Sequence, residues 1–260
     1  MNYENKLLLS LVNKISEIDK INFLKANLNT REINYLHKKY STKDLDKKYS
    51  LFKHYKCAFV DDFYYPVNLS KVEIPPFRIA STNYFPSTFD YYIGVFGSDH
   101  PNFYSMDDYY NFGYDLAKNN VGLVTLNFSG VSKIVQEGYS ACKKEHYCLL
   151  AGGFTALKYI YIKNPNTVFL SPFEVDGTPT QNSFLQSYEI YGALIDSLIL
   201  FQCGRGDDCK RGIARVLDCG TNVYVHQSAI SNNKCNEVSY NIYEEGCQVI
   251  NCLKDLLLYQ

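Results

Sequence analysis

The chain has 260 residues and a formal net charge of −1, and 46% of its residues are apolar. These values exclude an intrinsically disordered chain and leave room for one large or two modest domains with a buried core. The charge is uneven, because residues 1–56 hold twelve basic and six acidic residues whereas the remainder holds fourteen basic and twenty-one acidic ones. A basic segment on an acidic body fits either a nucleic-acid partner or a lysine-rich helical surface that faces solvent.

Nine cysteines lie between Cys57 and Cys252, and no two of them have the Cys-x-x-Cys spacing of a zinc site. Several sit inside apolar runs, where a thiol behaves as a small hydrophobe. No signal peptide opens the chain, and no apolar stretch approaches the length of a membrane span. We therefore expect reduced thiols, a cytoplasmic location, no metal centre and no membrane contact.

The N-terminal segment is predicted to be helical. Apolar residues recur at helical spacing over Glu4–Ala26, which predicts one amphipathic helix. Capping residues near Thr30 and Ser41 predict further short helices. We expect a small all-helical domain over residues 1–56, which either docks onto the body or contacts a DNA backbone through its lysines.

A connector separates this segment from the main body. His54–Val60 is predicted to end as a strand, and two separated proline sites exclude helix between residues 61 and 79. The second domain is expected over residues 57–260.

Strands and helices alternate from Tyr91 onward. Short apolar runs predict strands at Tyr91–Phe96, Gly122–Leu126, Tyr147–Ala151, Thr167–Leu170, Ser197–Phe201 and Thr221–His226, with a short element at Ile160 and Ile162. Helical spacing predicts helices at Met106–Asn119, Val131–Lys144, Phe184–Leu194, Lys210–Cys219 and Glu237–Glu245, and the apolar residues Val249–Ile250 with Leu253–Leu258 close the chain. This alternation predicts an α/β fold with a parallel, doubly wound sheet.

The turn after the first of these buried strands is the candidate ligand site. Phosphate binding there requires glycine, free N–H groups at a helix N-terminus and usually a nearby cation. Gly97 and Ser98 supply the first two, but Asp99 places a carboxylate where the cation belongs. Its repulsion of a phosphate in a partly enclosed cleft costs roughly 1–4 kcal/mol. The alternative interpretation of Gly97-Ser98 is a plain turn with a helix cap.

Replacement cations lie at or near the carboxyl ends of other predicted strands. They are Lys133, Arg205, Lys210 and Arg211, and His100 would join them if a nearby acid kept it protonated. Asp207 and Asp208 partly cancel their charge. The alternative interpretation is that these are solvated loop charges.

The sequence offers little for catalysis. No Ser-His-Asp or Cys-His arrangement emerges from the spacing, and the Gly-x-Gly-x-x-Gly turn of nicotinamide-binding domains is absent. We therefore expect no enzymatic activity and no cofactor.

Several motifs together resemble one known family. They are Asp62 with Tyr65-Pro66 and Pro75-Pro76, the strand and turn Ile93–Ser98, Gly130, the strand with two glycines Leu149–Gly153, the loop Ser171–Pro179, and Gly220 with Val223–Val225. In this order they resemble the DNA-processing protein A family, also called DprA or Smf, nearly without gaps from about Phe59 to Leu257. The resemblance implies a helical N-terminal domain followed by an extended Rossmann-like domain.

The polar and cationic residues of that family are largely replaced. Asp99 stands where the family has the Arg of a Gly-Ser-Arg turn, and Ser132 stands where it has an Asp. Further replacements are Ser187-Tyr188-Glu189 for an Arg-Asn-Arg cluster, Asp207-Asp208-Cys209 for a Ser-Gly-Ser stretch and Gln227-Ser228 for a Pro-Gly pair.

The resemblance implies a protein that binds single-stranded DNA and helps to load a RecA-type recombinase during natural transformation and recombination. The residues expected to contact DNA are Gly97, Ser98, His100, Gly130, Lys133, Arg205, Lys210 and Arg211. The alternative is a family member with a degenerate site that acts as an interaction scaffold. Such a scaffold would bind another protein, or a second copy of itself as a homodimer, through tyrosine-rich surfaces.

Overall fold

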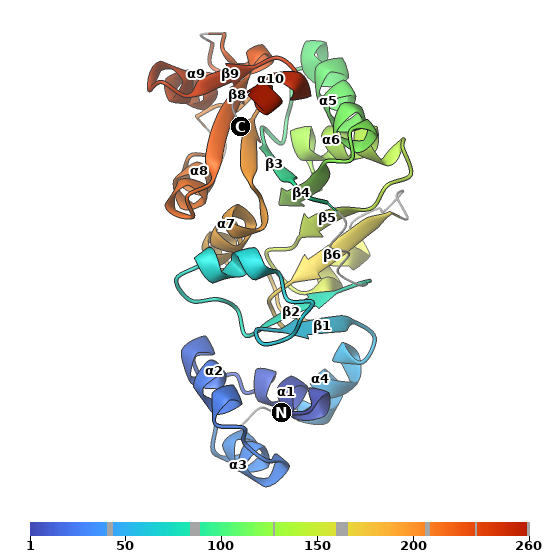
Figure 1. Cartoon of the computed structure of the whole chain (residues 1–260), viewed down its shortest axis with the longest axis vertical. Coiled ribbons are helices and arrows are strands. Elements are labelled where there is room, and N and C mark those ends of the chain that lie inside the picture. The colour runs from blue at the N-terminus through green and yellow to red at the C-terminus, as the bar shows by residue number, and fades with distance from the viewer. Residues whose placement is uncertain are drawn as a thin grey trace.

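The computed structural model describes residues 1–40, 44–83, 89–126, 128–159, 166–205, 209–231 and 233–258. Its strands form one sheet in the order β1-β2-β6-β5-β4-β3-β7-β8-β9, with helices on both faces (Figure 1). The N-terminal helices lie at one end of the long axis, and β8 and β9 lie toward the other (Figure 1). The predicted α/β, Rossmann-like architecture is confirmed.

Seven of the strands in the described part of the chain run parallel to one another. They are β3 (Tyr92–Phe96), β4 (Gly122–Leu126), β5 (His146–Leu149), β6 (Thr167–Ser171), β7 (Ser197–Leu200), β8 (Asn222–His226) and β9 (Gln248–Ile250). The central strands are buried along their whole length because helices cover both faces, which is why they read as continuous apolar runs. At one edge β1 (Lys56–Phe59) and β2 (Arg78–Ser81) continue the sheet in antiparallel fashion.

Two sets of helices cover the sheet. One face carries α5 (Met106–Lys118), α6 (Gly130–Ser140) and α10 (Leu253–Leu258), and the other carries α7 (Gln181–Leu194), α8 (Cys209–Asp218) and α9 (Glu237–Glu244). Helices α5 and α6 touch through their backbones. A Cβ atom on Gly138 would lie 1.9 Å from the carbonyl oxygen of Tyr110, and one on Gly113 would lie 2.0 Å from that of Val135. Glycine is therefore required at both positions.

The N-terminal segment forms α1 (Tyr3–Ser10), α2 (Glu17–Lys25), α3 (Thr30–Tyr40) and α4 (Leu45–Phe52). The single helix predicted over Glu4–Ala26 is wrong. The chain breaks after Ser10, and the Ser16 hydroxyl accepts a hydrogen bond from the Asp19 N–H to start α2 anew. Leu11 and Val12 are fully buried in the break, so tertiary packing replaces a turn of helix. The start predicted near Ser41 and the element at Ile160 and Ile162 fall outside the described residues.

The helical segment shares a hydrophobic core with the body. Leu9, Ile33 and Phe52 belong to the same buried cluster as Cys148 and Phe169 of the sheet. Three salt bridges between described residues join the surfaces around this core. Lys6 Nζ lies 2.6 Å from carboxylate oxygens of both Asp61 and Asp62, and Lys48 Nζ lies 3.6 Å from Glu174. These lysines hold the segment against the body, which favours docking for this part of the basic arm. The domain boundary at residue 56 stays a prediction.

The connector after β1 is pinned by its own side chains. Asp62 accepts a hydrogen bond from the Phe59 N–H at 2.9 Å, and the Tyr65 hydroxyl donates to the Pro76 carbonyl at 2.5 Å. The expectation that proline excludes all helix here is wrong for one stretch. A short 3₁₀ helix, η1 (Val67–Lys71), follows Pro66, whose fixed φ suits a helix start.

Candidate nucleic-acid interface

Two turns meet at the carboxyl ends of β3 and β4. The carbonyl oxygen of Ser98 accepts a hydrogen bond from the Val131 N–H at 3.0 Å, which ties the turn after β3 to the start of α6. Gly130 has a φ of +50°, and a Cβ atom there would lie 2.0 Å from the Ser98 oxygen. Both the backbone conformation and the close approach require glycine. The structure thus brings Gly97, Ser98 and Gly130 together.

A third segment closes the turn from the other side. The Ser98 N–H donates to the carbonyl oxygen of Gln202 at 2.6 Å, and the side chain of Gln202 accepts from the Asn102 N–H at 2.7 Å. The hydroxyl of Ser98 accepts from the His100 N–H at 3.1 Å. The N–H groups of Ser98, His100 and Asn102 are therefore engaged within the protein, and a phosphate would have to displace these bonds to use them.

Asp99 stands exposed on this turn, and its carboxylate accepts a hydrogen bond from the Ser129 hydroxyl. The bond links the β3 turn to the residue before α6. It also fixes the negative charge of Asp99 beside the backbone N–H groups of this turn, which are the groups expected to bind a phosphate.

The sheet order aligns the other predicted site residues with this turn. Because β3 lies between β4 and β7 and the three strands are parallel, the connections that leave them begin side by side at the carboxyl ends of the strands. Strands β4, β5 and β6 extend the sheet in chain order on one side of β3, and β7, β8 and β9 extend it on the other. The carboxyl ends of β3 and β7 are therefore the topological switch point, the place where doubly wound folds bind ligands. Lys133 lies in the first turn of α6, Arg205 follows β7, and Lys210 and Arg211 open α8.

Acidic groups offset part of this positive charge. The guanidinium of Arg205, with its side chain 84% exposed, donates from Nε to Glu237 at 2.8 Å. Lys133 Nζ lies 4.0 Å from Glu137, one turn along its own exposed helix face. Lys210 and Arg211 are exposed at the helix start. Asp207 and Asp208, which were expected to weaken these cations, fall outside the described residues.

A disulfide at this edge was not predicted. Cys203 after β7 and Cys209 at the start of α8 are joined, with their Cα atoms 6.6 Å apart, and the loop that they close carries Arg205. The expectation of nine reduced thiols is wrong for this pair in the structure. The sequence signal was the short spacing of the two cysteines across a strand-to-helix connection, which only the fold turns into proximity.

A buried tyrosine that sequence reasoning missed holds the strand before the turn. The Tyr191 hydroxyl on α7 accepts a hydrogen bond from the Val95 N–H at 2.6 Å and lies 3.1 Å from the Val95 carbonyl oxygen. A Cβ atom on Gly94 would lie 2.5 Å from this hydroxyl. Gly94 therefore makes room for the contact that fixes β3.

Among the described residues, no three His, Cys, Asp or Glu side chains are grouped so that they could hold a metal ion. Within the same part of the chain, no helix is long and apolar enough to cross a membrane.

Comparison with known proteins rests on structure. No protein-family model matches the sequence, and no curated protein matches it. DNA processing protein A from Streptococcus pneumoniae superimposes with a TM-score of 0.78 over 99% of this chain and 98% of that chain, at 16% sequence identity. DNA processing protein A from Helicobacter pylori, whose structure is described as giving insight into a single-stranded DNA binding mode, has a TM-score of 0.65 at 19% identity and covers 79% of this chain and 96% of that chain. The chain therefore has the fold of DNA processing protein A.

Proposed function

We propose that this protein is a divergent member of the DprA family that binds single-stranded DNA and assists a RecA-type recombinase. The observation that carries the proposal is the similarity of fold over nearly the whole chain to two structures of that family, one of them described by its single-stranded DNA binding. The sequence motifs that resemble the family lie along the same stretch of chain.

The geometry of the switch point supports this function. Four cationic side chains follow β4 or β7, the two neighbours of β3 in the sheet. Lys133 lies in the first turn of α6, Arg205 lies in the loop after β7, and Lys210 and Arg211 lie at the start of α8. Lys210 and Arg211 are exposed at the start of α8, where the helix dipole also favours an anion. A phosphate backbone is expected to run along this edge past α6, the β3 turn and α8.

A second function, an interaction scaffold that does not bind DNA, is favoured by a different observation. The N–H groups of the β3 turn bond within the protein, Asp99 holds a carboxylate at its mouth, and Arg205 is paired with Glu237. With these contacts in place, few N–H groups and cations at the switch point remain for a phosphate to bind. Binding to DNA decides between the two functions.

The test reverses the charges at the start of α8. A fluorescent oligothymidine is titrated with the wild-type protein and with the Lys210→Glu/Arg211→Glu double variant, and anisotropy reports binding. We expect the double variant to bind at least tenfold more weakly, because two phosphate contacts become repulsive.

A matched control carries the same change in charge elsewhere. Lys118 ends α5 and the exposed Lys143 follows α6, so both lie toward the amino ends of the strands. The Lys118→Glu/Lys143→Glu variant should bind within about threefold of the wild type, which is about 0.7 kcal/mol. Equal losses in both double variants would contradict the proposed site, and no binding by the wild type would favour the scaffold.

A further inference from the structure

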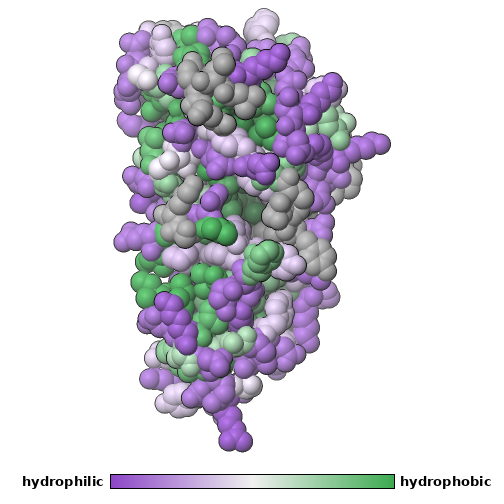
Figure 2. Space-filling model, viewed as in Figure 1, coloured by the Kyte–Doolittle hydropathy of each residue, from purple (hydrophilic) through white to green (hydrophobic). Residues whose placement is uncertain are grey.

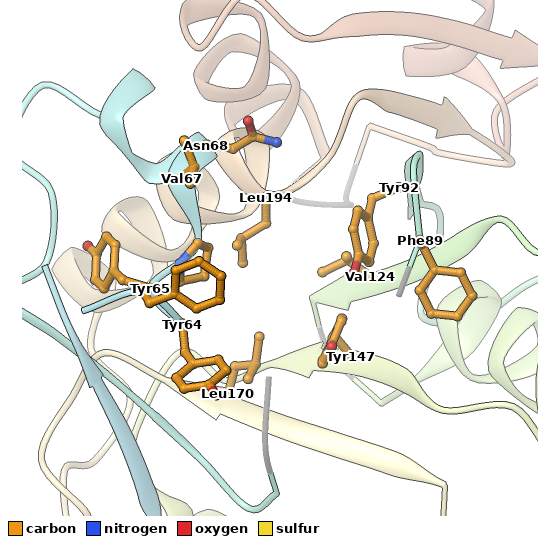
Figure 3. Close-up of a pocket in the computed structure, with 12 residues that line it drawn as sticks. Tyr64, Tyr65, Val67, Asn68, Phe89, Tyr92, Val124, Tyr147, Leu170 and Leu194 are labelled. Atoms are coloured by element: carbon orange, nitrogen blue, oxygen red, sulfur yellow. The ribbon is translucent and has the colours of Figure 1, made fainter. Parts of the chain in front are cut away.

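A cavity lies on the face of the sheet that α7 covers. Its volume is about 380 Å³, and strands β3 to β6 provide its floor through Tyr92, Val124, Tyr147 and Leu170. Leu194, the last residue of α7, and residues 63–68 of the connector around η1 provide part of its walls. Figure 3 shows Tyr64, Tyr65 and Leu194 on one side of the open space and Tyr92, Val124 and Tyr147 on the other.

The lining has one chemical character. Each residue is aromatic, aliphatic, proline or asparagine, and none of the described lining residues carries a charge at neutral pH. Six of them have aromatic rings: Phe63, Tyr64, Tyr65, Phe89, Tyr92 and Tyr147. Phe89 packs edge-to-face on Tyr92 with ring centroids 5.6 Å apart, and Phe63 packs in the same way on Tyr64 at 5.4 Å. Such walls favour flat, apolar molecules, and burying an unpaired charge among them would be unfavourable.

The floor also offers neutral polar atoms. The hydroxyls of Tyr92 and Tyr147 are hydrogen-bonded to each other, and burial raises the pKa of both groups. These hydroxyls therefore stay protonated at physiological pH and present no negative charge. Asn68 adds an amide from η1 at the opposite wall.

Large hydrophobic side chains at the mouth of the cavity are exposed to solvent. Phe63 is 92% exposed, Val67 82% and Tyr64 67%, and all three belong to the connector that forms one wall. On the face shown in Figure 2, hydrophobic residues gather over the middle and lower left, whereas hydrophilic residues occupy much of the outline. Grouped exposed hydrophobics of this kind mark binding surfaces.

We propose that this cavity, the aromatic pocket, binds an uncharged, planar aromatic small molecule. The cavity volume lies in the range of small-molecule sites and leaves no room for a helix of a partner protein. The lining has no cationic side chain that could pair with an anion, and its aromatic rings favour a flat, apolar ligand. The pocket and the switch point lie on different parts of the fold, so this proposal does not depend on DNA binding.

Two fluorescent probes that differ by one charged group test it. N-phenyl-1-naphthylamine is uncharged, and 1-anilinonaphthalene-8-sulfonate has the same ring system with a sulfonate. We expect the uncharged probe to bind the full-length protein saturably, with a dissociation constant at least tenfold below that of the sulfonate. Comparable affinities for the two probes would overturn the proposed selectivity.

Variants locate the bound probe. Leu194→Trp places an indole in the cavity and should weaken binding of the uncharged probe at least tenfold, whereas Leu217→Trp, at a 52%-exposed position on α8, should leave it within twofold. If circular dichroism shows that Leu194→Trp is unfolded, Asn68→Trp at the mouth takes its place. Unchanged binding in the folded pocket variant would overturn the proposal.

A second copy of the chain is the competing occupant. If the uncharged probe does not bind and sedimentation shows a dimer that Val67→Asp converts to a monomer, the pocket is an interface between copies and the small-molecule proposal is wrong.

Discussion

Asp99 decides how well the switch point can bind a phosphate. Its carboxylate lies on the turn between β3 and α5, bonded to Ser129 and exposed to solvent. The sequence predicted the position of this charge, because an apolar strand followed by Gly97-Ser98 fixes where the turn must lie. It did not predict that Gln202 would engage the Ser98 N–H, because that contact joins residues about a hundred positions apart.

Replacing this carboxylate by a cation should strengthen DNA binding. The Asp99→Arg variant removes a repulsion and adds a phosphate contact, so we expect at least tenfold tighter binding of oligothymidine, or about 1.4 kcal/mol. Anisotropy at low salt measures the change. Asp115→Arg, on the exposed surface of α5, is the charge-matched control and should shift affinity much less; equal shifts would show that only net charge matters.

His146 makes the fold sensitive to acid. It is fully buried in β5, its Nε2 lies 3.2 Å from the Thr167 hydroxyl, and its Nδ1 has no partner among the described residues. Burial lowers the pKa of His146 to about 4. The unfolded chain, with a histidine pKa near 6.5, therefore binds a proton more readily than the folded protein, and stability present above pH 6.5 is lost as the pH falls toward 4.

We expect the free energy of unfolding to fall by about 2 kcal/mol between pH 7 and pH 5 from this histidine alone. Urea denaturation at the two pH values measures the difference, and His146→Phe should reduce it by about that amount. If the variant keeps the full wild-type dependence on pH, His146 is not its source.

At the scale of elements, the sequence predicted what local patterns determine. The strand Gly122–Leu126 has the predicted bounds because a glycine begins a run that is apolar except for Thr125 and ends before polar residues. The Glu4–Ala26 helix was wrong because Leu11 and Val12 fit the helical spacing but are buried in a break that only the packed structure requires. The antiparallel pairing of β1 and β2 and the Cys203–Cys209 disulfide likewise depend on segments meeting in space.

The contact between α5 and α6 gives a test at this scale. Gly138→Ala forces a methyl group against the Tyr110 carbonyl. This carbonyl is part of the helix backbone and cannot move aside as the end of a flexible side chain could. We expect the free energy of unfolding to fall by about 3 kcal/mol. Asn111→Ala on the exposed surface of α5 should change it by less than about 0.5 kcal/mol. Urea unfolding compares the two, and a neutral Gly138→Ala would mean that the helices separate freely.

At the scale of the whole molecule, the N-terminal helices and the sheet share one core. Leu9, Phe52 and Phe169 are buried in one cluster, and Lys6 of α1 forms salt bridges with Asp61 and Asp62 of the body. A boundary drawn from composition, at residue 56, marks where helix gives way to strand. The buried contacts continue across it.

Cooperative unfolding should follow from this shared core. We expect far-UV circular dichroism and tyrosine fluorescence to report one coincident transition in urea. Lys6→Met should lower the urea midpoint of this transition and reduce the free energy of unfolding by about 1–2 kcal/mol. The loss is moderate because Asp61 and Asp62 lose their partner but stay partly exposed. Two separate transitions would show that the helical segment folds as an independent unit.

Binding to single-stranded DNA at the switch point is the central claim, and its dependence on salt tests it most directly. If Lys133, Arg205, Lys210 and Arg211 each neutralise one phosphate, the logarithm of the association constant should fall with the logarithm of salt concentration with a slope of about −3. Affinity for oligothymidine would then drop about 50-fold between 50 and 200 mM salt. No binding at 50 mM salt, or a slope near zero, would contradict the account.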